Sequence, residues 1–234
     1  MNKHTIPYKL YPVTDADKRR TIVLYHGWGS SVASYDNWGK SLSAKGFQVV
    51  IPELLYHDTR SPLQNYHDKS VLNEYFWKAV FWMIDEAREF LLPFYEKRED
   101  IILIGSSFGG FIASGIFSSI PYLGGLVNIN GTGAFCSFEN NIRAFSGEAP
   151  LSGGELQKFL TYDPLEKRVN KAPILLLHGD LDSVIPIQSK REYEQYLRRS
   201  TDTVNFITYK DVNHTITLEM EQDLFDWLER HYER

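Results

Sequence analysis

The stretch that decides the fold is residues 101–117, with the sequence IILIGSSFGGFIASGIF. It begins with four aliphatic residues, passes through a turn of glycine and serine, and ends in an apolar, helix-like run. Short runs of β-branched and aliphatic residues bounded by turn residues are typical of buried strands. The stretch therefore predicts a strand, a tight turn and a helix in immediate succession, with Ser107 on the turn.

Five further runs of the same kind occur along the chain, separated by polar turns and by helix-like segments. They predict strands at residues 21–25, 47–51, 126–129, 174–177 and 204–209. These runs are apolar on both faces, and such strands belong in a parallel sheet that helices cover on both sides.

Helical patterns lie between these strands. The segment 72–92 places apolar residues three and four apart, so Trp77, Phe81 and Trp82 are expected in the core. Further helices are expected at 188–199 and around Met220 to Leu228. The alternation of strand and helix predicts an α/β, doubly wound fold with a mostly parallel sheet.

No linker or repeat marks a domain boundary, so one domain is expected over residues 1–234. One irregular segment, about 131–171, is rich in glycine and aromatic residues and is long for a simple crossover. It predicts a small lid or cap insertion. An ordinary crossover helix with irregular ends is the alternative.

Composition excludes several classes of function. The chain has 25 Lys and Arg against 30 Asp and Glu, a net charge of −5, which disfavours a nucleic-acid partner. No apolar run approaches the ~18 residues of a membrane helix. Cys136 is the single cysteine, and no Cys/His cluster has zinc spacing, so we expect no cofactor, no metal and a cytoplasmic protein. The oligomeric state stays open.

The turn at residues 105–109 has the pattern G-x-S-x-G. Glycines on both sides let two backbones approach closely, and the following helix N-terminus favours developing negative charge above it. Ser107, rather than its neighbour Ser106, has glycine two residues away on both sides. This pattern predicts that Ser107 is a nucleophile.

A serine nucleophile needs a base, and the base needs a group that orients it. Downstream, residues 178–186 have the sequence HGDLDSVIP, and residues 211–214 have the sequence DVNH. Each follows the carboxyl end of a predicted strand, where open α/β sheets bind ligands. The histidine is His214, and the acid is Asp182, with Asp180 as its competitor.

Together with the sequence HGWG at 26–29, which follows the first apolar strand, these motifs resemble the α/β-hydrolase family. The resemblance covers nearly the whole chain and matches the family's chain order of serine, acid and histidine. It implies Ser107 as nucleophile, Asp182 as acid and His214 as general base. It also implies that the backbone N–H groups of Trp28 and Phe108 form the oxyanion hole.

Within that family the chain is most similar to small prolyl-oligopeptidase-like and dienelactone-hydrolase-like esterases. These often carry a histidine, a small residue and an arginine where this chain has HDTR at 57–60, with Asp58 in place of the usual glycine. His57 and Arg60 are candidates for the substrate pocket, with loop ordering or a surface ion pair as the alternative. Dienelactone hydrolases proper use a cysteine nucleophile, which disfavours that activity here.

The resemblance implies a serine hydrolase that cleaves a small-molecule ester through an acyl-serine. A peptidase, amidase or thioesterase would use the same triad. A hydrolase-fold protein that only binds a ligand is the alternative from another class.

Overall fold

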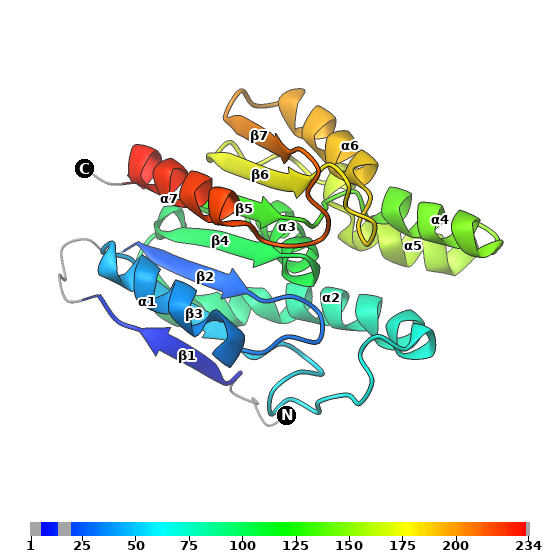
Figure 1. Ribbon diagram of the computed structural model, residues 1–234, viewed down its shortest axis with the longest axis horizontal. Coiled ribbons are helices and arrows are strands. Elements are labelled where there is room, and N and C mark those ends of the chain that lie inside the picture. Colours follow the sequence, from blue (N-terminus) through cyan, green and yellow to red (C-terminus); the bar gives the residue numbers. More distant parts are fainter. Residues whose placement is uncertain (1–5, 14–19, 233–234) are drawn as a thin grey trace.

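The computed structural model describes residues 6–13 and 20–232, and its centre is a seven-stranded sheet (Figure 1). The strand order is β1-β3-β2-β4-β5-β6-β7, and every neighbouring pair is parallel except β1 with β3. The strands are β1 (Tyr8–Tyr11), β2 (Thr21–Tyr25), β3 (Gln48–Pro52), β4 (Ile101–Ser106), β5 (Gly125–Ile129), β6 (Ile174–Gly179) and β7 (Val204–Tyr209). The predicted α/β fold and its six parallel strands are confirmed.

The antiparallel strand β1 is missing from the sequence prediction. Tyr8 pairs with Pro52 and Tyr11 with Val49, so β1 closes the open edge of β3. Three of its four residues are exposed, and Lys9 forms an ion pair with Asp36 at 2.6 Å. Four residues are too few to show a strand period, and a lysine is typical of edge strands.

Helices cover both faces of the sheet (Figure 1). One face carries α1 (Asp36–Ala44) and α7 (Leu218–Tyr232), and the other carries α2 (Lys69–Leu91), α3 (Phe108–Ser119) and α6 (Ile187–Arg198). In the described part of the chain, four short 3-10 helices complete the connections: Ala33–Tyr35, Leu92–Phe94, Arg98–Asp100 and Pro164–Glu166. No helix in the described ranges is both long and apolar enough to cross a membrane.

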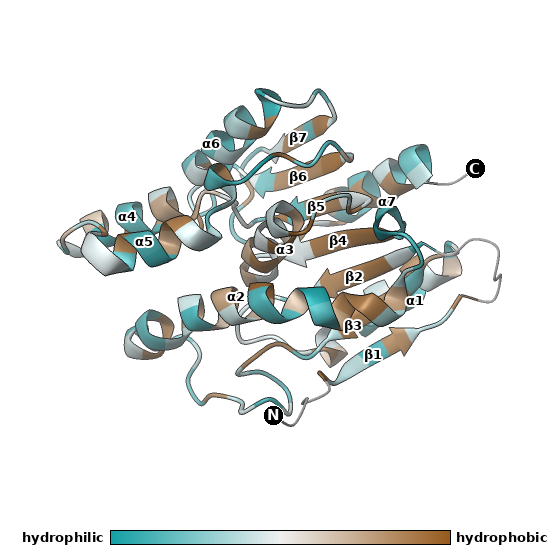
Figure 2. Ribbon diagram, turned by 180° about the vertical axis from the view of Figure 1, so that it is seen from behind, coloured by the Kyte–Doolittle hydropathy of each residue, from teal (hydrophilic) through white to brown (hydrophobic). Residues whose placement is uncertain are grey.

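Alternate residues of each central strand enter opposite cores, as the two-residue period of a strand requires. In β2, Val23 and Tyr25 face the cluster beneath α2 and α3, whereas Ile22 and Leu24 face the cluster beneath α1 and α7. Figure 2 shows hydrophobic colours concentrated on the strands and on α3, with hydrophilic colours on outer helices such as α6.

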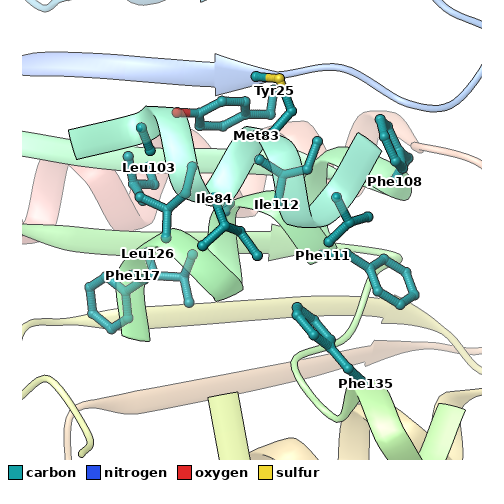
Figure 3. Close-up of a cluster of buried hydrophobic side chains, with 14 of the residues drawn as sticks. Tyr25, Met83, Ile84, Leu103, Phe108, Phe111, Ile112, Phe117, Leu126 and Phe135 are labelled. Carbon is teal, nitrogen blue, oxygen red and sulfur yellow. The ribbon is translucent and has the colours of Figure 1, made fainter. Parts of the chain in front are cut away.

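Helix α3 lies in the centre of the larger core. Its residues from Phe108 to Phe117 are all buried, so it is apolar on every side, as expected of an enclosed helix. Figure 3 shows Phe111 and Ile112 of α3 lying among side chains from neighbouring elements, including Met83 of α2. This packing fixes the helix that follows the Ser107 turn.

One core prediction on α2 is wrong. Phe81 is buried and Trp77 is half-buried, but Trp82 is 55% exposed and donates its indole N–H to Glu86 at 2.8 Å. Each residue turns a helix by about 100°, so Trp82 lies beside the buried stripe that Phe81 occupies.

The irregular segment 131–171 folds into α4 (Phe135–Ser146) and α5 (Gly153–Tyr162), which lie beyond the carboxyl ends of the strands (Figure 1). Both are attached to α2: Trp77 donates to Glu139 at 2.7 Å, and its ring lies 4.8 Å from that of Phe159. That this segment acts as a lid stays a prediction.

The approach of α3 to the sheet depends on two glycines of the Ser107 turn. A Cβ on Gly105 would lie 2.0 Å from the carbonyl oxygen of Gly109, and one on Gly109 would lie 2.0 Å from that of Tyr25. Both collisions are with backbone, which no side-chain rotation relieves.

We expect Gly109→Ala to lower the free energy of unfolding by about 3 kcal/mol or more, because a methyl group there forces the α3 and β2 backbones apart. Gly154→Ala is the matched control, since Gly154 is an exposed residue of α5 whose Cβ would meet nothing within 4 Å. The control should be neutral or stabilising by up to ~1 kcal/mol. Urea unfolding measures both, and equal effects would contradict the close-approach argument.

Candidate active site

Ser107 occupies the sharp turn between β4 and α3. Its backbone angles are φ 54° and ψ −119°, in a region that residues with a side chain rarely adopt. Two hydrogen bonds hold it there: its N–H donates to the Ile129 carbonyl at 2.8 Å, and its own carbonyl accepts from Gly110 N–H at 2.8 Å. Ser106, by contrast, is the buried last residue of β4, paired with Ile129. The turn therefore presents Ser107 at the carboxyl edge of the sheet.

Ser107, His214 and Asp182 form one continuous chain of hydrogen bonds. The Ser107 hydroxyl lies 2.8 Å from His214 Nε2, and His214 Nδ1 lies 2.7 Å from Asp182 Oδ2. Since Nδ1–H donates to the carboxylate, Nε2 is left to accept the serine proton. The three residues come from the ends of β4, β6 and β7, far apart in the sequence.

Asp182 is held as a carboxylate. Burial by itself would raise its pKa, but hydrogen bonds from His214 and from Ile185 N–H outweigh that effect, and the pKa lies below its usual value. Its second oxygen accepts from the N–H groups of Val184 and Ile185 at 2.9 and 2.8 Å. Its competitor Asp180 is exposed and instead accepts from Asp211 N–H at 2.7 Å.

A buried histidine, His178, supports the acid loop. Its Nε2 lies 2.8 Å from the Ile185 carbonyl and 3.4 Å from Asp182 Oδ2. Burial, reinforced by Lys190, lowers the pKa of His178 to about 3, so the ring is neutral at physiological pH. As a neutral donor to a carbonyl, it shapes the loop without competing with His214 for the charge on Asp182.

The loop at residues 26–32, here called the oxyanion loop after the role predicted for it, lies against Ser107. A Cβ on Gly27 would lie 3.7 Å from the Ser107 Cβ, and the Trp28 and Phe108 rings pack edge to face at 5.0 Å. Among the described residues, no acceptor pairs with the backbone N–H of Trp28 or of Phe108. Phe108 is also the first residue of α3, where the first N–H groups of a helix have no partner inside it.

The two residues expected in a substrate pocket, His57 and Arg60, both lie in the loop between β3 and α2. His57 is 0% exposed, and its Nε2 accepts the N–H of Gly29 at 3.0 Å, so full burial removes it from any surface that a substrate meets. Arg60 forms a two-pronged ion pair with Glu86 of α2, at 2.7 and 2.9 Å. These contacts agree with loop ordering, the alternative that the sequence left open, and a role of Arg60 in the substrate pocket stays a prediction.

Asn130, which the sequence prediction missed, connects the strand ends that carry the site. It follows β5 with φ 48°, a conformation that asparagine tolerates well. Its side-chain amide donates to the Thr215 carbonyl at 2.7 Å and accepts from Gly179 N–H at 3.1 Å. Asn130 thereby joins the loop of His214 to the end of β6, where the acid loop begins.

A buried lysine behind the site was also missed. Lys190 of α6 is fully buried and donates to the backbone carbonyl of Asn128 at 2.9 Å and also to its side-chain oxygen. The Asn128 amide in turn donates to Gly110 and Ser114 of α3 at 2.9 and 2.8 Å. Burial lowers the pKa of Lys190 well below its usual value. Nothing in the sequence distinguishes Lys190 from the surface lysines of a charged helix.

Cys136 gives no alternative nucleophile. Burial, together with Asp163, raises the pKa of its thiol to about 12, so the reactive thiolate is scarce at neutral pH. In the part of the chain that the structure describes, no three His, Cys, Asp or Glu side chains are grouped as metal ligands would be.

Comparison with known proteins agrees with this geometry. The sequence profile of the Dienelactone hydrolase family matches residues 9–226. The chain is 22% identical to YitV of Bacillus subtilis (strain 168), covering 96% of this chain and 94% of that protein. It is 24% identical to "Esterase YjfP" of Escherichia coli (strain K12), covering 80% and 78%.

Among solved structures, TT1662 from Thermus thermophilus superposes with a TM-score of 0.77 at 16% identity, covering 98% of this chain and 94% of that one. At this identity the superposition shows the fold alone. The family match extends over nearly the whole chain and includes the Ser107 turn and both downstream loops. The chain therefore belongs to the dienelactone hydrolase family.

Proposed function

We propose that this protein is a serine esterase that hydrolyses a small carboxylic ester through an acyl-serine intermediate. The observation that carries the proposal is the unbroken hydrogen-bond chain from Ser107 through His214 to Asp182. Membership of a hydrolase family and the name of the Escherichia coli relative support it.

In the first half of the reaction, His214 Nε2 takes the proton of Ser107 as the serine oxygen attacks the ester carbonyl carbon. The carbonyl oxygen becomes an oxyanion, which the N–H groups of Trp28 and Phe108 stabilise. When the carbon–oxygen bond to the alcohol breaks, His214 returns its proton to the departing alkoxide. Ser107 is left acylated and His214 neutral.

Water then repeats the sequence. His214 takes a proton from water as the water oxygen attacks the acyl carbon. The protonated His214 then gives that proton to the Ser107 oxygen when the acyl–serine bond breaks. The carboxylic acid leaves and the free enzyme is restored. Asp182 stays ionised throughout and stabilises the imidazolium form of His214, which agrees with its lowered pKa.

Thioesters and activated amides are open to the same chemistry. We compare kcat/KM on p-nitrophenyl esters of increasing acyl length with kcat/KM on matched thioesters and aminoacyl anilides. This comparison ranks esters, thioesters and amides as substrates. We expect the highest kcat/KM on short esters.

Ser107→Ala should lower kcat/KM on p-nitrophenyl acetate by ~10⁴-fold or more, because the acyl acceptor is lost. A fluorophosphonate probe should label the wild-type protein at Ser107 and leave the variant unlabelled. Circular dichroism and urea unfolding control for folding. A folded Ser107→Ala protein with wild-type activity would refute the esterase mechanism, and a wild-type protein that the probe does not label would indicate a binding protein.

Asp182→Asn should lower kcat by ~10⁴-fold, since an amide no longer holds His214 in the tautomer that accepts the serine proton. Asp180→Asn is the matched control, because it lies two residues away and its amide oxygen still accepts from Asp211 N–H. We expect its kcat within about threefold of wild type. The reverse ranking would assign the acid role to Asp180.

A further inference from the structure

The segment between β3 and α2, residues 53–68 and here called the clamp loop, contacts the oxyanion loop at three places. We propose that the clamp loop positions the oxyanion hole, and that Asp58 and His57 are its positioning residues. This inference rests on the proposed function, since it concerns how the Trp28 N–H reaches the reacting carbonyl oxygen.

The first contact involves His57. Its Nε2 accepts the N–H of Gly29 at 3.0 Å, and its Nδ1 lies 3.0 Å from the Leu55 carbonyl oxygen. A ring nitrogen that accepts carries no proton, whereas one that faces a carbonyl must donate. Only the neutral tautomer with the proton on Nδ1 meets both demands, so this tautomer fixes the residue next to Trp28.

The second contact is made by Asp58. Its carboxylate oxygens accept the N–H of Val32 at 3.2 and 3.3 Å, and Oδ2 lies 3.4 Å from Nε2 of the fully buried His26. Burial opposes ionisation of Asp58, but His26 and the Val32 N–H outweigh it and lower its pKa. The carboxylate thus binds the end of the oxyanion loop at Val32 and contacts its beginning at His26.

The third contact fixes the side chain of Trp28. Its indole N–H donates to the Tyr66 carbonyl at 2.8 Å, and its ring packs edge to face on those of His57 and Tyr66. The proposed oxyanion donor is therefore the backbone N–H of Trp28. Its side chain and the next residue, Gly29, are both hydrogen-bonded to the clamp loop.

The clamp loop is itself rigid. Arg60 joins it to α2 through Glu86 and also donates to the Glu53 carbonyl at 3.0 Å. The Tyr66 hydroxyl donates to the Tyr56 carbonyl at 2.6 Å, which closes the loop on itself. These bonds connect the loop to the main core, so it can hold the oxyanion loop against movement.

The backbone conformation of Asp58 is a further indication that its carboxylate has a role in holding the oxyanion loop. Asp58 has φ 51°, a conformation in which glycine is the least costly residue. An aspartate in this conformation is less stable than a glycine would be, but its carboxylate accepts the Val32 N–H and contacts His26. Replacement by glycine removes the carboxylate without adding strain, so Asp58→Gly isolates the clamp contact.

The neutral form of His57 gives a pH prediction. Burial, then the electrostatic effect of His26, lowers the pKa of His57 from its ordinary 6.5 to about 4, and Asp58 and Tyr66 are the other titratable groups facing it. Between these values the unfolded chain binds a proton that the folded chain does not, so stability falls as the pH drops from about 6.5 to about 4. His57→Gln, which keeps an acceptor and does not titrate, should flatten this decline in urea unfolding. An unchanged slope would contradict the buried neutral ring.

The clamp is tested with four variants. Asp58→Gly deletes the carboxylate, and Asp58→Asn keeps one oxygen for the Val32 N–H. Val32→Pro deletes the N–H itself, and the backbone φ of Val32, −52°, suits a proline ring. Tyr122→Gly is the control, because Tyr122 also has a positive φ, 66°, but is 69% exposed. It lies in the turn before β5, at the amino ends of the strands, whereas Asp58 lies beyond the carboxyl end of β3.

We measure kcat/KM on p-nitrophenyl acetate and the affinity for an aryl trifluoromethyl ketone, which forms a tetrahedral oxyanion on the serine. Asp58→Gly and Val32→Pro should lower both by the same factor, about 10- to 100-fold. The corresponding methyl ketone, which forms no such adduct, should bind as it does to wild type. Asp58→Asn should lose less than Asp58→Gly, and Tyr122→Gly should match wild type.

The double variant Val32→Pro, Asp58→Gly gives the sharpest test. Both changes break the same bond, so together they should cost no more than the larger single loss. Wild-type kcat/KM in Asp58→Gly and Val32→Pro, fully additive losses, or equal weakening of both ketones would overturn the proposal. If Asp58→Gly does not fold, Val32→Pro and Asp58→Asn decide it by the same criteria. Activity retained in Ser107→Ala would instead refute the proposed function itself.

Discussion

The close approach of α3 to β2 and β4 is the constraint on which the rest of this structure depends. Glycines 105 and 109 remove the side chains that would collide with backbone oxygens, and Ser107, midway between them, is forced to φ 54°. The packing of the buried α3 and the hydrogen bond from Ser107 N–H to the Ile129 carbonyl stabilise this strained backbone conformation. The same geometry exposes the Ser107 hydroxyl and leaves the Phe108 N–H free at a helix N-terminus.

The electrostatics of the site follow from which buried groups receive hydrogen bonds. Asp182 accepts from two backbone N–H groups and from His214, so it stays ionised despite burial. His178 and Lys190 are also buried near Asp182, and burial lowers the pKa of both. In the proposed mechanism, the charge of Asp182 therefore stabilises an imidazolium on His214 rather than on His178, whose pKa is about 3. Opposite shifts of this kind are how a folded chain assigns acid and base roles.

The sequence predicted the parts of the molecule that depend on local pattern. The six parallel strands are runs of apolar residues, and Ser107, Asp182 and His214 stand in short motifs at strand ends. The strand β1 escaped prediction because it is an edge strand of four residues that buries only Tyr11 and so shows no pattern of alternating burial. The roles of three other residues could not be predicted, because their partners are far away in the sequence. The separation is 49 and 85 residues for Asn130, 62 for Lys190 and 26 for Asp58. His57 was noticed but placed in a pocket, since a sequence does not reveal which side of a loop is buried.

The most direct test of the account is a crystal structure of the protein after reaction with a small fluorophosphonate, whose phosphonyl oxygen takes the place of the oxyanion. We predict a covalent bond from Ser107 Oγ to phosphorus, with that oxygen about 2.7 to 3.1 Å from the N–H groups of both Trp28 and Phe108. An adduct on another residue, or a phosphonyl oxygen that points away from the two N–H groups, would contradict it.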